Sequence, residues 1–342
     1  MKDGGAYERL VRPLLFSLDP ETAHHLTLRI LRIAARLPVA LRALHRFQPP
    51  AKPKTLFGLT FPNPIGLAAG FDKNGVALPA WAALGFGFIE IGTVTAKAQP
   101  GNPRPRIFRY PEQEALINRL GFNNDGAEVV AARLRKLRGS GSWPPIPVGI
   151  NIGKSKVTPL DQAVDDYLHS FRLLSPTVDY VVINVSSPNT VGLRSLQHRS
   201  ALRELLSSIM NENQTCVHPR PILLKIAPDL GERELDEIIA TSEEHGLAGI
   251  IATNTIAGAL NTAREGQQNG GISGAPLQSR STEIVRLIRR RSQLCIIGVG
   301  GICDAESARE KMSAGAQLLQ VYTGYIYKGP MLLREITEAL WR

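Results

Sequence analysis

The feature that most constrains the fold is a series of eight short apolar, β-branched runs, which alternate with helical patterns from residue 64 to the end of the chain. This alternation is typical of βα units, whose strands lie parallel in one sheet. Eight such strands favour an α/β fold of the closed (β/α)8 type, the TIM barrel, over an open doubly wound sheet, which more often has about six. The predicted strands are residues 64–70, 87–95, 147–153, 178–187, 221–228, 247–255, 294–302 and 317–324.

Helical periodicity fills most of the intervals between these runs. Two connections, residues 96–125 and 256–280, are longer than a barrel needs, and long ordered loops in compact domains are usually functional. We therefore divide the chain into a helical extension, residues 1–50, and a catalytic barrel domain, residues 51–342. The predicted helices of the barrel are residues 128–137, 162–174, 201–211, 232–245, 282–291, 305–314 and 330–341.

The net charge of +10 is compatible with nucleic acid, an anionic membrane surface, or ligands that carry phosphate and carboxylate groups. The sequence lacks the basic stretches interleaved with aromatic residues that nucleic-acid binders use, so we expect no nucleic-acid partner. Cys216, Cys295 and Cys303 have no metal-type spacing. We expect inert thiols and no metal site.

Polar residues end each predicted strand, and in a (β/α)8 barrel the chemistry gathers at these carboxyl ends. The fourth run leads into Asn184-Val185-Ser186-Ser187-Pro188-Asn189-Thr190, a loop richer in amides and hydroxyls than a turn requires. Gly300-Gly301 and Thr323-Gly324 follow the last two runs, where barrels bind phosphate through backbone amides. The sequence therefore predicts a site for a small planar polar molecule and a phosphate-bearing cofactor.

Two lysines and four asparagines also lie at or near strand ends. Lys73 and Lys225 need an anionic partner or a role in chemistry if they are buried, although a lysine at a barrel rim can also extend to solvent. A lone asparagine is usually a turn residue, but four near strand exits suggest amide recognition of a heterocycle. The four are Asn151, Asn184, Asn189 and Asn254.

The extension contains two predicted helices, residues 7–18 and 20–37, separated by Asp19-Pro20-Glu21, a helix-capping signal. In the second helix an apolar stripe lies beside arginines, a pattern that suits a helix in a membrane interface. The alternative is a helix that simply packs on the barrel, with a solvated basic face. The stripe is Leu26, Ile30, Ile33 and Leu37, and the arginines are Arg29, Arg32 and Arg36.

Five motifs, in this order along the chain, resemble the class 2, quinone-dependent dihydroorotate dehydrogenases, and the likeness runs from about residue 14 to the carboxyl terminus. The resemblance implies an FMN enzyme that oxidises (S)-dihydroorotate to orotate in pyrimidine biosynthesis and passes the electrons to a membrane quinone. The motifs are Ala69-Gly70-Phe71-Asp72-Lys73, Asn118-Arg119-Leu120-Gly121-Phe122-Asn123-Asn124, residues 184–190, Lys225-Ile226-Ala227-Pro228-Asp229 and Ala252-Thr253-Asn254-Thr255.

The resemblance also implies residue roles. Ser187 would be the base that takes the C5 proton of dihydroorotate, with Thr190 and Phe122 as its proton relay. Lys225 would stabilise the charge of reduced FMN. The substrate would be bound by Lys73, Asn118, Arg119, Leu120, Gly121, Phe122, Asn184, Asn189, Asn254 and Thr255. The FMN contacts would be Ala69, Gly70, Phe71, Asp72, Lys73, Thr93, Asn151, Asn184, Lys225, Thr253, Gly274, Gly301, Tyr322 and Thr323. The quinone contacts, in a tunnel formed by the extension, would be His24, Arg109 and Tyr322.

Ser187 also indicates class 2 rather than class 1. By the same resemblance, the soluble class 1 enzymes have a cysteine at this position and lack the amino-terminal extension. We therefore expect a monomeric peripheral membrane protein on the cytoplasmic face of the cell membrane, in contact with anionic lipid. One alternative is a soluble FMN barrel dehydrogenase that uses fumarate or NAD as acceptor. Another is a non-catalytic flavin-binding or scaffold protein with the same fold.

Overall fold

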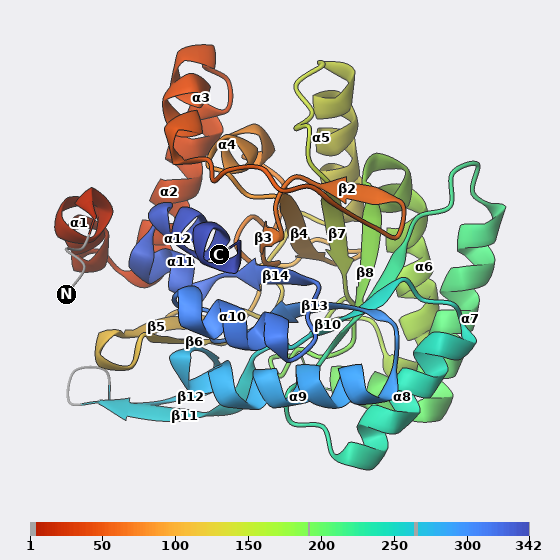
Figure 1. Ribbon diagram of the computed structural model, residues 1–342. Helices are drawn as coiled ribbons and strands as arrows, with labels where there is room; N and C mark the ends of the chain where they lie inside the picture. The colour runs from red at the N-terminus through yellow and green to blue at the C-terminus, as the bar shows by residue number, and fades with distance from the viewer. Residues whose placement is uncertain (1–4, 191, 263–265, 342) are drawn as a thin grey trace.

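The computed structural model of the chain describes residues 5–190, 192–262 and 266–341. Its centre is a closed barrel of parallel strands, in which each strand lies inside one of the eight predicted runs (Figure 1). The predicted (β/α)8 barrel is therefore confirmed. In order around the barrel the strands are β10 (Gly249–Ala252), β13 (Cys295–Val299), β14 (Leu318–Val321), β3 (Ile65–Leu67), β4 (Phe88–Val94), β7 (Val148–Ile152), β8 (Tyr180–Asn184) and β9 (Ile222–Ile226).

The barrel strands are buried along their whole length, as expected for parallel strands covered by helices on one side and packed side chains on the other. All seven predicted barrel helices are present. Two further helices, α4 (Leu78–Ala83) and α11 (Thr323–Lys328), are too short to show a helical period in the sequence. The predicted seven are α5 (Ala127–Gly139), α6 (Ala163–Leu174), α7 (Arg199–Thr215), α8 (Glu232–Glu244), α9 (Gln278–Arg291), α10 (Ala305–Ser313) and α12 (Met331–Leu340).

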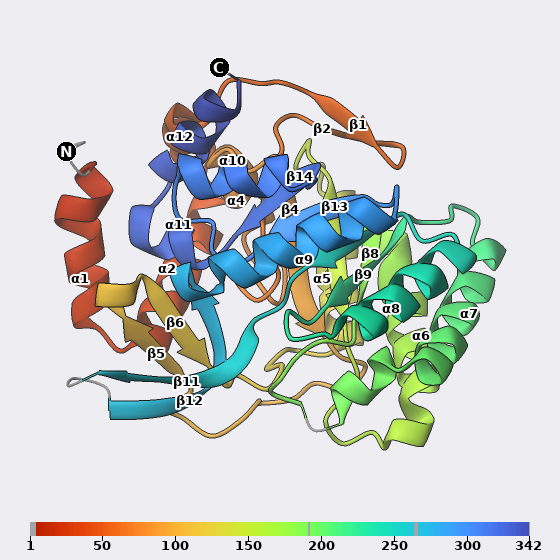
Figure 2. The ribbon, with the colours of Figure 1, turned by 60° about the horizontal axis from the view of Figure 1, so that its bottom comes forward.

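The two long connections form a second sheet together. Its antiparallel order is β11-β12-β6-β5, and β12 pairs with β6 so that Ile272 lies opposite Ile117 (Figure 2). Side chains of its own strands, Phe108 and Tyr110 among them, form a small apolar cluster. The sequence predicted ordered loops here and no strands. The strands are β5 (Ile107–Tyr110), β6 (Ala115–Asn118), β11 (Ile256–Thr262) and β12 (Gly266–Gly274).

A hairpin of β1 (Lys54–Leu56) and β2 (Leu59–Phe61) covers the amino ends of the barrel strands. The Phe61 ring lies 5.3 Å from that of Phe88, the first residue of β4, and 5.5 Å from that of Phe57 in the hairpin turn. Aromatic rings therefore close this end of the barrel. The carboxyl end is the one left for a ligand.

The extension forms three helices outside the barrel, α1 (Arg12–Ser17), α2 (Pro20–Ala34) and α3 (Pro38–Leu44), after a π-helical turn at Tyr7–Val11 (Figure 1). Asp19 caps α2 as predicted, because its Oδ1 accepts the backbone N–H groups of Glu21 and Thr22 at 3.1 and 3.0 Å. The second predicted helix ends at Ala34 rather than residue 37, and a separate helix begins at Pro38.

The apolar stripe of α2 is exposed rather than packed on the barrel. Ile30 is 55% exposed and Ile33 is 51% exposed, while α2 contacts the barrel through Leu28 and Leu31. On α1, Leu14 is 72% exposed. The helix therefore does pack on the barrel, but through a face other than the predicted stripe, which is left exposed. None of the described helices is both long and apolar enough to cross a bilayer.

Candidate functional site

One cavity lies at the carboxyl ends of the barrel strands, beside the second sheet. Most of the predicted site residues line it, and they come from all eight strand ends except that of β7, together with the two long connections. The predicted residues in the lining are Ala69, Gly70, Lys73, Thr93, Asn118, Leu120, Gly121, Phe122, Asn184, Ser187, Asn189, Lys225, Thr253, Asn254, Thr255, Gly274, Gly301, Tyr322 and Thr323.

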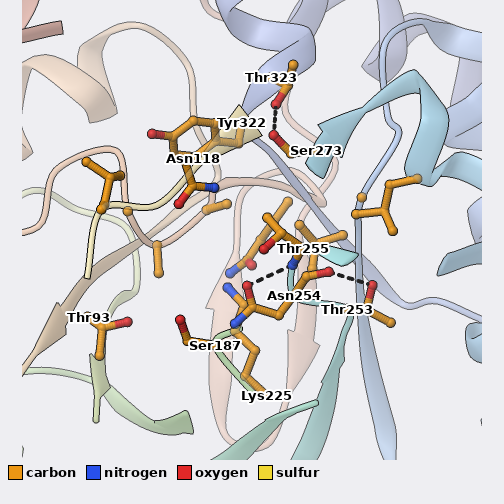
Figure 3. A pocket seen from close by; sticks show the side chains of 18 of the residues that line it. Thr93, Asn118, Ser187, Lys225, Thr253, Asn254, Thr255, Ser273, Tyr322 and Thr323 are labelled. Carbon is orange, nitrogen blue, oxygen red and sulfur yellow. Dashed lines mark hydrogen bonds between the residues drawn. The ribbon is translucent and has the colours of Figure 1, made fainter. Parts of the chain in front are cut away.

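Ser187 and Ser186 face different surroundings. Ser186 Oγ donates to Asn184 Oδ1 at 3.0 Å and accepts from Asn254 Nδ2 at 3.0 Å, so it is committed to the amide network. Ser187 lines the cavity near Lys225 and Asn254, and its Oγ accepts the backbone N–H of Asn189 at 3.2 Å (Figure 3). The hydroxyl available for chemistry is therefore that of Ser187.

Amides link the loop after β8 to the second sheet. Asn189 Nδ2 donates to Asn118 Oδ1 at 3.1 Å, and Asn118 Nδ2 donates to the backbone carbonyl of Gly271 at 3.3 Å. Asn118 ends β6 and Gly271 lies in β12, so both long connections build this wall of the cavity. Amide groups at this position can hydrogen-bond a small polar ring.

A second amide network lies across the barrel from β4 to β8. Thr93 Oγ1 donates to Asn151 Oδ1 at 2.6 Å, and Asn184 Nδ2 donates to the same oxygen at 3.0 Å. Asn151 is fully buried and lies outside the lining, and its Nδ2 donates to Glu90 Oε1 at 2.8 Å. Asn151 therefore orients lining residues rather than contacting the cavity.

Sequence reasoning missed Glu90, which is fully buried beneath the cavity. Its Oε1 lies 3.3 Å from Lys225 Nζ, and its Oε2 accepts from Gln320 Nε2. Because Nε2 must face this carboxylate, Gln320 Oε1 faces elsewhere, and it has no partner among the described residues. Gln320 lines the cavity, so its free oxygen is an acceptor for a ligand N–H. The sequence feature that could have identified Glu90 is the presence of a carboxylate within the otherwise apolar run 88–94.

Two glycines after β13 bring backbone close to the cavity. Gly300 and Gly301 have φ of +109° and +72°, and a Cβ on Gly301 would lie 2.2 Å from Gln278 Cα. Only glycine permits both the conformation and the approach. Nearby, Thr323 Oγ1 donates to Ser273 Oγ at 2.8 Å, which joins the end of β14 to β12 (Figure 3). Backbone N–H groups in such a loop suit an anion.

Lys73 has its ammonium group at the cavity edge, where Nζ donates to the Gly70 carbonyl at 2.9 Å. Burial, and then the charge of Arg106, lower the pKa of Lys73 to about 8. A carboxylate ligand would relieve both effects. Asp72 next to it is fully buried and outside the lining; its carboxylate accepts the N–H groups of Val76 and Ala77, both at 2.9 Å, and so shapes the loop.

Aromatic rings connect the cavity to the extension. The Phe71 ring lies 5.0 Å from that of Tyr322 in the cavity wall and 5.5 Å from the imidazole of His24 on α2. Burial, followed by the charges of Lys73 and His25, lowers the pKa of His24 to about 3, while burial raises the pKa of Tyr322 to about 12. Both side chains are therefore neutral at physiological pH.

Arg109 of β5, a predicted quinone contact, contacts the carboxyl end of α1. Its Nη1 donates to the Leu15 carbonyl at 3.1 Å, its Nη2 donates to the Leu18 carbonyl, and its guanidinium lies 4.5 Å from the centre of the Phe16 ring. These contacts hold α1 against the second sheet. The structure thus brings His24 and Tyr322 together through Phe71, while Arg109 holds the end of α1.

Sequence reasoning also missed the ion pair that fastens α2. Arg106 Nη2 lies 2.7 Å from Glu21 Oε1, and both side chains are buried. Arg106 Nη1 donates to the Pro100 and Asn102 carbonyls at 2.6 and 2.8 Å. An arginine in a predicted loop is usually exposed to solvent. Nothing in the sequence around Arg106 therefore indicated that its side chain would be buried.

Thr190 and Arg119 also lie outside the lining, as do Asn151, Asp72, Phe71, His24 and Arg109. Thr190 is buried in the loop of Ser187, and no hydrogen bond joins the two hydroxyls within the described part of that loop. Arg119 lies over the Phe108 ring at 4.8 Å and donates to the Pro105 carbonyl, so it braces the second sheet. Phe122, the other predicted relay residue, lines the cavity with φ of +53°.

Comparisons with known proteins give one family throughout. The family model described as dihydroorotate dehydrogenase matches residues 53–342. The chain is 50% identical to dihydroorotate dehydrogenase (quinone) from Chloroflexus aurantiacus, over 98% of this chain and 96% of that one. It is 53% identical to the protein of the same name from Gloeobacter violaceus, over 97% and 93%. A solved ligand-free DHODH structure from Eimeria tenella matches with a TM-score of 0.85 at 38% identity, over 94% of each chain.

Proposed function

Because the chain belongs to the dihydroorotate dehydrogenase family, we propose that it oxidises (S)-dihydroorotate to orotate in pyrimidine biosynthesis, with FMN as its prosthetic group and a quinone as electron acceptor. The observation that carries the proposal is the convergence of the Ser187 hydroxyl, paired amides and the Lys225 ammonium on one cavity. Fumarate and NAD are not the acceptors named for its half-identical relatives.

The lining fits FMN in two ways. The Gly300-Gly301 loop offers backbone donors for a phosphate, and Gln320 Oε1 is a buried acceptor with no partner among the described residues, as a flavin ring N–H requires. Lys225 would hold the N1 and O2 edge of the ring and stabilise its negative charge in the reduced state. When bound, FMN supplies the acceptor for the C6 hydride of dihydroorotate.

Ser187 acts as the base that removes the C5 proton, while the hydride leaves from C6. The C5–H bond breaks and its proton passes to Ser187 Oγ while the hydride leaves C6. Ser187 Oγ accepts the Asn189 N–H, which stabilises negative charge on that oxygen and so helps Ser187 to give up its own proton as it takes the one from C5. Its own proton leaves by way of Thr190 through a bridging water, because no direct hydrogen bond joins the two hydroxyls in the described part of the loop. Phe122 helps to keep bulk water from the reacting atoms.

The remaining polar residues hold the substrate. Asn118 and Asn189 are already joined at 3.1 Å and present their remaining donors and acceptors to the ring amides. Asn254 and Thr255 bind from the opposite wall, and Lys73 balances the substrate carboxylate. Arg119 supports this binding by bracing the sheet that carries Asn118.

The extension delivers the quinone. The exposed apolar side chains of α1 and α2 enter the interface of an anionic membrane on the cytoplasmic face of the cell membrane, which makes a peripheral, monomeric protein. Neutral His24 and Tyr322, with Phe71 between them, suit a neutral quinone close to the flavin. Residues 1–50 thus form a quinone-delivery unit, and residues 51–342 form the catalytic barrel.

The test is an assay of purified protein with dihydroorotate and a short-chain quinone, with orotate followed by its absorbance. Ser187→Ala should lower turnover at least ~100-fold, the usual contribution of a positioned base, without loss of bound flavin. Arg203→Ala, far out on α7, is the control and should leave turnover unchanged. Turnover with fumarate but not quinone would contradict the acceptor, and undiminished turnover of Ser187→Ala would contradict the base.

A further inference from the structure

Lys311 lies outside the cavity, behind the Gly300-Gly301 loop that is proposed to bind phosphate. Lys311 on α10 is fully buried, and among the described residues no carboxylate lies within ion-pair distance of its ammonium group. Burial lowers the pKa of Lys311 to about 7. Such a group destabilises a fold unless something compensates for it, so its position calls for an anion.

Hydrogen bonds connect this lysine to the loop. Lys311 Nζ donates to Ser281 Oγ, and Ser281 Oγ donates to the Gly300 carbonyl at 2.8 Å. Ser281 on α9 is also fully buried. The hydroxyl is thus oriented by the ammonium and fixes the direction of one carbonyl in the loop.

The direction of that carbonyl determines where the next N–H points. The Gly300–Gly301 peptide is trans, so the carbonyl of Gly300 and the N–H of Gly301 point in opposite directions. The carbonyl faces Ser281, behind the cavity, and the Gly301 N–H has no acceptor among the described residues. Since Gly301 lines the cavity, its N–H is left to a ligand.

We propose that Lys311, acting through Ser281, is a positioning residue for the FMN phosphate: it holds the Gly300–Gly301 peptide with its N–H toward the cavity and places a positive charge behind it. The inference rests on the proposed FMN cofactor. It adds an anchor from α10, an element that contributes nothing to the cavity lining. The phosphate is in turn the anion that compensates for the buried ammonium.

The test compares FMN with riboflavin, which lacks the phosphate. Lys311→Met keeps the side-chain length and removes the charge, and should raise the dissociation constant of FMN at least ~10-fold while that of riboflavin changes less than ~2-fold. The holoenzyme is diluted to follow release of fluorescent FMN, and the flavin-depleted protein is then titrated with each flavin. Ser281→Ala should weaken FMN in the same direction but less.

Thermal unfolding of the flavin-free protein separates this role from a structural one. Replacing an unpaired buried charge with an apolar side chain should leave the melting temperature of Lys311→Met unchanged or raise it, although FMN binds more weakly. The matched control is Lys154→Met, which removes another buried lysine, one that donates to the Ser155 carbonyl at 2.9 Å away from the loop. This variant should leave the ratio of FMN to riboflavin affinity unchanged.

Equal losses of FMN and riboflavin affinity in Lys311→Met would assign the lysine to folding alone, and unchanged FMN affinity would show that the loop needs no such anchor. A wild-type protein that binds riboflavin as tightly as FMN would overturn the phosphate site and this inference together. A wild type that prefers FMN, combined with an unaffected Lys311→Met, would overturn only this inference.

Discussion

The barrel cavity and the extension differ in which groups they leave without a partner. At the cavity floor the fully buried Glu90 is met by Lys225, Asn151 and Gln320. On the extension Leu14 and Ile30, 72% and 55% exposed, have apolar surface in contact with solvent. The barrel thus pairs its buried carboxylate and leaves polar groups such as Gln320 Oε1 for a ligand, whereas the extension carries apolar surface that another apolar phase would cover.

The largest effect should follow from removing one partner of the buried pair at the cavity floor. Lys225→Met leaves Glu90 as an uncompensated buried charge and should lower the free energy of unfolding by about 3–5 kcal/mol. Chemical denaturation of the flavin-free protein measures this loss. Adding Glu90→Gln should restore most of it, because no charge then stays buried alone. A double variant as unstable as the single one would show that Glu90 is compensated elsewhere.

A somewhat smaller effect is expected at the exposed apolar surface. Leu14→Glu combined with Ile30→Glu should weaken binding to anionic phospholipid vesicles about 100-fold, since each apolar side chain contributes roughly 1.5 kcal/mol when it leaves water. Vesicle sedimentation measures the binding, and bleaching of the flavin by dihydroorotate should be unaffected. Val217→Glu is the control, because Val217 is 90% exposed after α7, away from the extension. An equal loss of vesicle binding in Val217→Glu would contradict the proposal that the extension carries the membrane-binding surface.

The smallest effect concerns the contact between the two regions. Burial raises the pKa of Glu21, but the hydrogen bond and charge of Arg106 outweigh burial and leave this pKa below its ordinary value of 4.5. A lowered folded-state pKa stabilises docking of α2 above the unfolded-state value, and this stability is lost as the pH falls through the folded-state value. Hydrogen exchange of α2 should therefore accelerate below about pH 4.5.

Glu21→Gln should remove this acid dependence and cost about 1.5 kcal/mol of local stability at pH 7, the scale of one hydrogen bond to a charged group. Exchange in α8, on the far side of the barrel, provides the internal reference. If hydrogen exchange of α2 in Glu21→Gln still accelerated at low pH as much as in the wild type, a carboxylate other than Glu21 would be responsible for the acid-sensitive docking of the extension.

The sequence predicted the barrel because its strands are fully buried and therefore consist mostly of apolar residues. It also predicted most of the cavity lining, since the carboxyl ends of parallel strands must meet at one edge. The second sheet escaped prediction because β12, Gly-Gln-Gln-Asn-Gly-Gly-Ile-Ser-Gly, is polar and rich in glycine. Its strand conformation comes from pairing with β11 on one side and β6 on the other, which only the folded chain provides.

Buried charges were the other class that sequence reasoning missed. Glu90, Arg106 and Lys311 all lie in segments where a charged residue is normally a sign of exposure. Each is buried because a group distant in sequence meets it: Lys225 for Glu90, Glu21 for Arg106 and Ser281 for Lys311. Periodicity reports which face of an element is apolar, and it says nothing about such distant partners.

The pairing of β6 with β12 also sets an order of assembly. Asn118 and Gly271, hydrogen-bonded at 3.3 Å, are 153 residues apart in the chain, so the wall that carries Asn118 cannot form until most of the polypeptide has been synthesised. Closing so long a loop is entropically unfavourable until the intervening barrel strands bring its ends together. A nascent chain that ends before β12 would therefore lack a finished substrate wall, and competence to bind dihydroorotate arises late in folding.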